Sequence, residues 1–281
     1  MDRLKLHAQA VIAALQFLTR LPVPVQVPFE KPVLSRSVIY FPLAGALIGC
    51  ALWLASELLD WALPPWPAAI ILVSLWVLLT GGLHLDGWMD TADGVLSHRP
   101  RDRMLEIMKD SRVGAMGVIA AVLLLLLKTS VIAELFVISS QHEVSAGMLY
   151  ALSAIWSRMW MAAAIGGWPK ARGEEGLAAL FNDVNKESVF ASVTLSVLLS
   201  FLALNINGIN RISVIGLASG PLGAALLVAG AGAVTVICGG AMALWLTRKL
   251  GGLTGDTYGA MNEAIEATLL LAALIWIHQQ I

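Results

Sequence analysis

The sequence predicts an all-α polytopic membrane protein with about seven transmembrane helices and an N-terminal helix at the membrane surface. Of its 281 residues, 58% are hydrophobic and only 13% are charged, and the mean hydropathy is +0.79. A soluble domain carries roughly 25% charged residues. Apolar stretches of about 20 residues recur along the whole chain, the length that spans a ~30 Å hydrocarbon layer. We therefore expect one membrane-embedded domain over residues 1–281.

The N-terminal helix is predicted from a short apolar segment, residues 8–18, that is closed by Pro22 and Pro24. This segment is too short to span a bilayer and no clear cleavage site follows it, so it reads as a retained interfacial helix. The seven spans follow at about residues 38–59, 67–83, 117–138, 147–166, 188–206, 224–246 and 262–279. Residues 212–222, interrupted by glycine and proline, are interpreted as a loop or a re-entrant piece.

The basic residues predict the orientation of these spans. Of the 18 lysines and arginines, Lys128 and Arg158 fall inside predicted spans and Arg211 lies on one side. The remaining 15 lie on the other side, in residues 1–36, 84–116, 167–187 and 247–261. Positive residues accumulate on the cytoplasmic side of membrane proteins. Most acidic residues share that side, so we expect the active site at the cytoplasmic face.

Three aspartates form the first candidate site, in the stretch "GGLHLDGWMDTADG" at residues 81–94. If the preceding helix continues past Gly82, then Asp86, Asp90 and Asp93 stand at i, i+4 and i+7 on one face. Like charges at this spacing repel one another. A divalent cation reverses that repulsion, and carboxylate oxygens suit Mg²⁺ or Mn²⁺. The spacing predicts a metal site; for a single aspartate, capping a span end in solvent would be the simpler reading.

Cations follow directly in "SHRPRDRMLEIMKDSRVGAMG", residues 97–117. Metal ions and basic side chains together bind the oxygens of a phosphoryl group. Arg103, Lys109 and Arg112 are the candidates, and Asp110 and Ser111 lie between the last two. If residues 103–112 are helical, Lys109 and Arg112 are neighbours at i, i+3. His84 is a candidate base or a supporting residue, and a polar residue at a span end is the alternative.

The second polar stretch is "GGLTGDTYGAMNEAIEA", residues 251–267. Glycines precede a helix expected to begin near Met261, and backbone N–H groups at such a turn attract anions. Gly255 and Asp256 in this loop are therefore candidate substrate-binding residues. Glu263 and Glu266 enter the last span, where acids are costly, and Lys128 and Arg158 are their candidate partners.

Five motifs give the chain its resemblance to a known family: the two stretches 81–94 and 103–117, "LQFLTRLPVP" at 15–24, "YFPLAGALIG" at 40–49 and "GLTGDTYGAMNEAIE" at 252–266. The sequence resembles the cobalamin synthase family, the adenosylcobinamide-GDP ribazoletransferases, over nearly its whole length. Trp88 and Met89 replace the usual smaller residues after "HLDG", and every acid is retained.

The resemblance implies a reaction in which adenosylcobinamide-GDP is joined to α-ribazole or its 5′-phosphate with Mg²⁺, releasing GMP. Asp86, Asp90 and Asp93 would hold the metal ions. One of these acids, or Asp110 or His84, would take the proton of the attacking hydroxyl, so the catalytic set stays open. The phosphate-binding set comprises Arg103, Lys109, Ser111, Arg112, Gly255 and Asp256.

The expected partners are these small-molecule substrates and membrane lipid, with no nucleic acid. The expected location is the bacterial inner membrane, with the catalytic loops cytoplasmic. A homo-oligomer, or a complex with other membrane enzymes of the late cobalamin pathway, stays open. One alternative is an enzyme like the CDP-alcohol phosphotransferases, whose pattern begins D-x2-D-G, as in Asp90, Asp93 and Gly94. Its following Ala-Arg is replaced by Ser97 and His98. A transporter is a more distant alternative.

Overall fold

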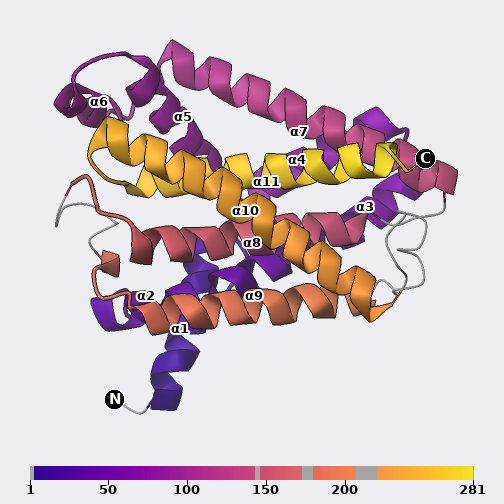
Figure 1. Ribbon diagram of the computed structural model, residues 1–281, viewed down its shortest axis with the longest axis horizontal. Coiled ribbons are helices and arrows are strands. Elements are labelled where there is room, and N and C mark those ends of the chain that lie inside the picture. The colour runs from indigo at the N-terminus through magenta and orange to yellow at the C-terminus, as the bar shows by residue number, and fades with distance from the viewer. Residues whose placement is uncertain (1–2, 143–145, 173–179, 207–219, 281) are drawn as a thin grey trace.

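Long apolar helices dominate the computed structural model, which describes residues 3–142, 146–172, 180–206 and 220–280 (Figure 1). Six helical segments are long and apolar enough to cross a membrane, and the count rises to seven if one bent pair forms a single span. The long helices are α3 (Phe41–Ala62), α4 (Pro65–Thr80), α7 (Ala115–His142), α8 (Gly147–Gly167), α9 (Lys186–Ile206), α10 (Pro221–Leu250) and α11 (Gly255–His278). The prediction of a polytopic all-α membrane protein is confirmed.

The ends of these helices separate into two groups (Figure 1). At the left end lie α5 (Leu83–Leu96), α6 (Arg101–Ile107), the end of α8 and the turn between α10 and α11. At the right end lie the turn between α3 and α4 and the C-terminus. The segments that the basic residues assign to one side of the membrane therefore gather at one end of the bundle, which we call the polar end.

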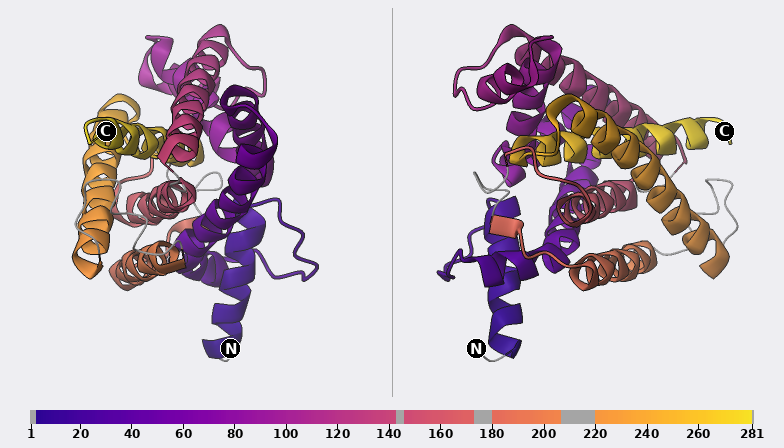
Figure 2. Two further views of the ribbon diagram at one scale, coloured as in Figure 1. Left: turned by 90° about the vertical axis from the view of Figure 1, so that its right-hand side faces the viewer. Right: turned by 60° about the vertical axis from the view of Figure 1, so that its left-hand side comes forward.

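The N-terminal helix α1 (Arg3–Leu18) runs crosswise to the long helices, with the chain terminus at its far end (Figure 2). Its second half is anchored by the buried residues Ala10, Ala13, Ala14 and Leu18. The segment after it folds back, and Gln16 donates a hydrogen bond to the carbonyl of Val25 at 2.6 Å. Helix α2 (Lys31–Ser37) and the 3-10 turn η1 (Val38–Tyr40) then lead into α3. A crosswise orientation is the one an interfacial helix requires.

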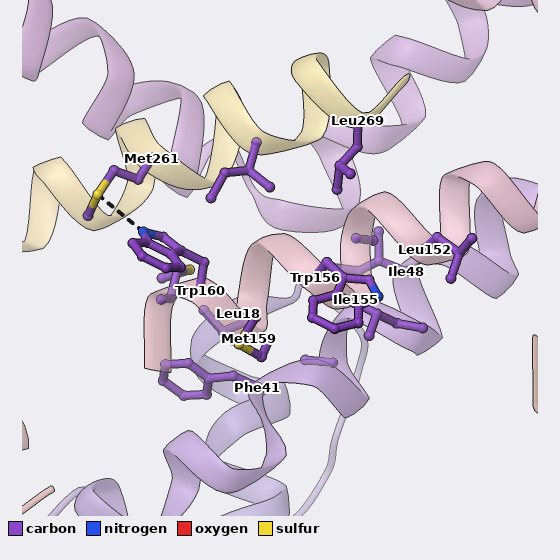
Figure 3. Packing of buried hydrophobic residues seen from close by; sticks show 14 of the residues in the cluster. Leu18, Phe41, Ile48, Leu152, Ile155, Trp156, Met159, Trp160, Met261 and Leu269 are labelled. Carbon is purple, nitrogen blue, oxygen red and sulfur yellow. Dashed lines mark hydrogen bonds between the residues drawn. The ribbon is translucent and has the colours of Figure 1, made fainter. Parts of the chain in front are cut away.

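Helix α8 lies at the centre of the core and is buried along almost its whole length. Small residues allow α3 to approach it closely, because a Cβ on Gly45 or Gly49 would overlap the α8 backbone at Ala154 or Ala151. On the other side the Trp160 indole donates to Met261 Sδ of α11 at 3.5 Å (Figure 3). Helix α8 thus packs between α3 and α11.

The expectation that the helix before the aspartates continues past Gly82 is wrong. Gly81 and Gly82 both adopt left-handed conformations, with φ of 63° and 72°, and the chain turns by 90° between α4 and α5. Gly81 ends α4 as its C-cap, the position where glycine is most favoured. The helical spacing of the three aspartates survives because all three lie within α5.

Other features differ less from what the sequence predicts, or lie outside the described residues. Cys50 and Cys238 are free thiols. Helix α10 begins at Pro221 and extends through Leu250, a longer span than predicted. Most of the loop predicted at 212–222, together with Arg211, lies outside the described residues.

Candidate active site

Helices α5 and α11 form the framework of the site, because glycines let their backbones touch. A Cβ on Gly87 would overlap the backbone of Asp256, and a Cβ on Gly259 would press on the backbone of His84. Such close approach between apolar helices is typical of small residues at membrane helix interfaces. It places the first turn of α11 directly beside the predicted acidic face of α5.

Helix α11 begins six residues earlier than predicted, at Gly255 rather than near Met261. The reason is a capping box: Thr254 Oγ1 accepts from the Thr257 N–H at 3.3 Å, and Thr257 Oγ1 accepts from the Thr254 N–H at 2.8 Å. Asp256 consequently lies in the first helical turn and not in a loop. The positive end of the helix dipole favours a carboxylate there.

A second loop joins this turn and brings in an arginine. The segment after α8 pairs with the segment before α11 through two backbone bonds, from Ala171 N to Leu253 O at 2.9 Å and from Leu253 N to Pro169 O at 2.8 Å. Arg172 follows, and its guanidinium lies 3.4 Å from the Asp256 carboxylate. It also donates to the carbonyl of Leu105 in α6 at 3.3 Å, while its buried Nε has no partner. Sequence reasoning missed Arg172, counting it only as a loop cation.

The Asp93 side chain binds backbone N–H groups of another helix. Its two carboxylate oxygens accept the N–H groups of Gly114 and Gly117, each at 2.7 Å. These groups belong to the start of α7, so Asp93 caps that helix with a charge-assisted bond. A Cβ on either glycine would overlap the carboxylate, which explains the glycines at these positions.

A cavity of about 150 Å³ lies between α5 and α11. Its polar lining residues are His84, Asp86, Asp256 and Tyr258, and its apolar walls include Phe17 and Phe181. Gly255 lines it at the start of α11. The structure therefore brings together four predicted residues from two distant stretches: His84, Asp86, Gly255 and Asp256.

Negative charge is concentrated beside this cavity. The half-buried Asp90 carboxylate faces the charges of Asp86, Asp256 and Asp93, which the nearby Arg172 partly offsets. Within the described part of the chain, no group of three or more His, Cys, Asp and Glu side chains is arranged to hold a metal ion. Mg²⁺ usually binds one or two protein carboxylates together with substrate phosphates. The crowded carboxylate donors fit that mode of binding.

The predicted cations of residues 103–112 lie outside the cavity lining. Residues 103–112 do not form one helix, because α6 ends at Ile107 and Asp110 then accepts both the backbone and the guanidinium N–H groups of Arg112. Lys109 and Arg112 are therefore not helical neighbours. Arg103 instead pairs with Glu106 at 2.5 Å, and Lys109, Asp110, Ser111 and Arg112 are all exposed.

The Asp110–Arg112 pair also bears on the search for a base. The hydrogen bonds from Arg112 lower the pKa of the Asp110 carboxyl to about 2. A carboxyl this acidic is a weak proton acceptor near neutral pH. Asp110 is thus a poor candidate for the general base.

A buried ion network lies behind the cavity. Lys128 of α7 donates to Glu263 at 2.8 Å and to Glu266 at 2.6 Å, and Glu266 also pairs with Arg158 of α8. Arg158 in turn reaches the Nδ1 atom of His84 at 3.3 Å. The predicted pairing of the intramembrane cations with the acids of the last span is confirmed.

Fold and site together define a polytopic helical membrane protein whose functional groups meet in an acidic cavity at one end of the bundle. The family model described as cobalamin-5-phosphate synthase matches residues 10–274. The chain belongs to this family.

Its relatives have consistent names. The adenosylcobinamide-GDP ribazoletransferase of Brevibacillus brevis is 37% identical, over 93% of this chain and 96% of its own length. The proteins of the same name from Desulfitobacterium hafniense and Pseudomonas putida are 38% and 39% identical, each over 92% of this chain and over 94% and 95% of their own lengths. No solved structure matches the chain significantly.

Proposed function

We propose that this protein is an adenosylcobinamide-GDP ribazoletransferase. It joins adenosylcobinamide-GDP to α-ribazole or α-ribazole 5′-phosphate and releases GMP, yielding adenosylcobalamin or its 5′-phosphate. The relatives' shared name and near-complete coverage support the reaction. The observation that carries the chemistry is the gathering of Asp86, Asp90 and Asp256 with Arg172 beside one cavity.

In this reaction a ribose hydroxyl forms a new bond to the phosphorus on the cobinamide side of the pyrophosphate. The bond from that phosphorus to the bridging oxygen breaks, and the electron pair leaves with GMP. The hydroxyl proton passes to a carboxylate. Asp86 and Asp256 line the cavity, and we assign this role to Asp256 because Asp86 is assigned to the metal. Arg172, with its unpartnered Nε, is placed to bind phosphate oxygens.

We assign Mg²⁺ to Asp86 and Asp90. When bound, the ion neutralises charge on the pyrophosphate and on the departing GMP. Asp93, the third ligand of the sequence prediction, is assigned instead to capping α7, because both of its oxygens accept backbone N–H groups. It would hold the start of α7 against α5.

The polar end of the bundle is proposed to face the cytoplasm of a bacterial inner membrane. The excess of lysine and arginine at that end supports this orientation. Adenosylcobinamide-GDP carries a charged pyrophosphate, so a site at the aqueous surface suits it.

The direct test is to incubate the purified protein with adenosylcobinamide-GDP, α-ribazole and Mg²⁺ and to measure GMP and adenosylcobalamin. Equal amounts of the two products are expected. GMP release without adenosylcobalamin would indicate hydrolysis and contradict the proposal, as would the absence of both products from protein that remains folded.

A further inference from the structure

His84 differs from the other polar residues of the cavity because its surroundings define where its ring proton lies. Its side chain is completely buried in the first turn of α5 and lines the cavity. One ring nitrogen, Nδ1, lies 3.3 Å from the Nη2 atom of Arg158. The other, Nε2, is buried and has no hydrogen-bond partner.

The contact with Arg158 determines the tautomer. A guanidinium carries N–H donors and no acceptor, so Nδ1 must be the acceptor in this contact. A neutral imidazole has one donor and one acceptor nitrogen. The ring proton therefore lies on Nε2, which makes Nε2 a hydrogen-bond donor.

The charges around Arg158 are paired with one another. Two cations, Lys128 and Arg158, are matched by two anions, Glu263 and Glu266, through the ion pairs of the network. Asn262 adds a further donor to Glu266 at 3.1 Å.

The orientation of Arg158 is itself fixed. Its Nη1 atom pairs with Glu266 and donates to Ser157 Oγ at 3.0 Å, which leaves Nη2 for His84. Lys128 holds Glu266 from the opposite side and lies 4.4 Å from the centre of the Trp76 ring. The tautomer of His84 is thus set by a series of contacts that runs from Lys128 through Glu266 to Arg158.

Resting on the proposed function for the location of the substrate, we propose that His84 acts as a neutral hydrogen-bond donor through Nε2–H to an oxygen of the bound pyrophosphate. Acting as a donor excludes His84 as the base that takes the hydroxyl proton. It assigns the buried network a function, which is to orient a donor at the polar end of the bundle.

Amide side chains of different length can show whether His84 donates a hydrogen bond or accepts a proton. The side-chain nitrogen of His84→Gln can occupy the position of Nε2 and donate from it, whereas His84→Asn is shorter and His84→Ala has no donor. We expect His84→Gln to retain activity within a few-fold of wild type. His84→Ala and His84→Asn should lose roughly 10- to 150-fold in kcat/KM for adenosylcobinamide-GDP. Equal losses in folded His84→Gln and His84→Ala would overturn the proposal.

A spectroscopic measurement needs no activity. In protein with ¹⁵N-labelled histidine, the shifts of the two ring nitrogens report which one carries the proton, and the His84→Gln variant identifies the His84 signals. We expect protonated Nε2 and unprotonated Nδ1. An imidazolium, or a proton on Nδ1, would overturn the proposal. If wild-type protein shows the expected tautomer and releases no GMP, the proposed function fails while the tautomer assignment stands.

Discussion

Arg172 and Asp256 form an ion pair at 3.4 Å that connects the segment after α8 to the first turn of α11. The same guanidinium donates to the carbonyl of Leu105, so Arg172 links three segments of the polar end. Its contact with Asp256 is longer than a strong charge-assisted hydrogen bond, and its Nε is unpartnered. This arrangement is suited to a side chain that rebinds to a phosphate when the substrate arrives.

Replacement of Arg172 should therefore affect substrate binding and turnover. Arg172→Ala should lower kcat/KM for adenosylcobinamide-GDP by roughly 10- to 150-fold, because one charge-assisted contact is lost. Arg172→Lys should retain only part of the wild-type kcat/KM, since a lysine cannot make a bidentate contact with a phosphate. Steady-state GMP release measures both. Arg99→Ala and Arg112→Ala, at exposed positions, are the controls. An equally large loss of kcat/KM in these variants would mean that the basic residues act as a diffuse electrostatic surface and that Arg172 makes no specific contact.

Metal dependence should be traceable to Asp86 and Asp90. EDTA should abolish activity, and Mg²⁺ or Mn²⁺ should restore it. Asp90→Asn should raise the metal concentration needed for half-maximal activity by removing a charged ligand while preserving the shape of the side chain. Asp93→Asn is the comparison, since its expected defect is a weakened cap on α7, with an unchanged metal requirement. Normal metal dependence of Asp90→Asn would remove Asp90 from the ligand set.

The close contact of α5 and α11 should be sensitive to a single methyl group. Gly87→Ala should destabilise the protein by about 1–3 kcal/mol and reduce activity, because the new Cβ overlaps the backbone of Asp256. Gly230→Ala is a matched control in α10, where nothing lies within 4 Å of the added atom, and its helix should be as stable or slightly more so. Thermal unfolding in detergent compares the two. Identical unfolding temperatures would argue against the tight packing.

Removing one charge from the buried ion network should destabilise the protein more than removing an oppositely charged pair. Lys128→Met leaves Glu263 without its cation and should destabilise by roughly 3–5 kcal/mol. Adding Glu263→Gln restores the balance of charge and should recover part of the loss, a coupling that a double-mutant cycle in thermal unfolding would measure. Additive effects would show that the two side chains do not interact.

Cysteine labelling in intact cells tests the orientation. With Cys50 and Cys238 replaced by serine, a cysteine at residue 100 should be protected from a membrane-impermeant reagent, and one at residue 64 should react. These residues lie at opposite ends of the bundle, in the turn before α6 and in the turn between α3 and α4. Labelling at residue 100 and not at 64 would reverse the topology.

Periodicity and charge were enough to predict the helical membrane class and the gathering of the polar segments at one end. Both depend on local signals, the length of apolar runs and the count of basic residues. The break between α4 and α5 also had a local signal, since paired glycines are typical of a helix end. It was missed because the apolar run continues through Leu79 up to the glycines.

Other features depend on tertiary contacts that no local pattern contains. The Arg172–Asp256 pair exists because two loops form backbone bonds, and nothing near Arg172 in the sequence indicates that partner. The early start of α11 is an exception, because it depends on a local contact: Thr254 and Thr257 form a variant of the capping box with threonine in place of the usual Glu or Gln. Asp93 matched the metal pattern, and only the approach of Gly114 and Gly117 shows its role as a cap.

The buried ion network has a consequence for biogenesis. Lys128 and Arg158 are synthesised in α7 and α8, well before the ribosome reaches Glu263 and Glu266 in α11. Until that last helix enters the membrane, two cations have no counterions, so the earlier helices cannot complete their assembly within lipid. A chain truncated before α11 would therefore carry Lys128 and Arg158 without Glu263 and Glu266, a costly state within lipid.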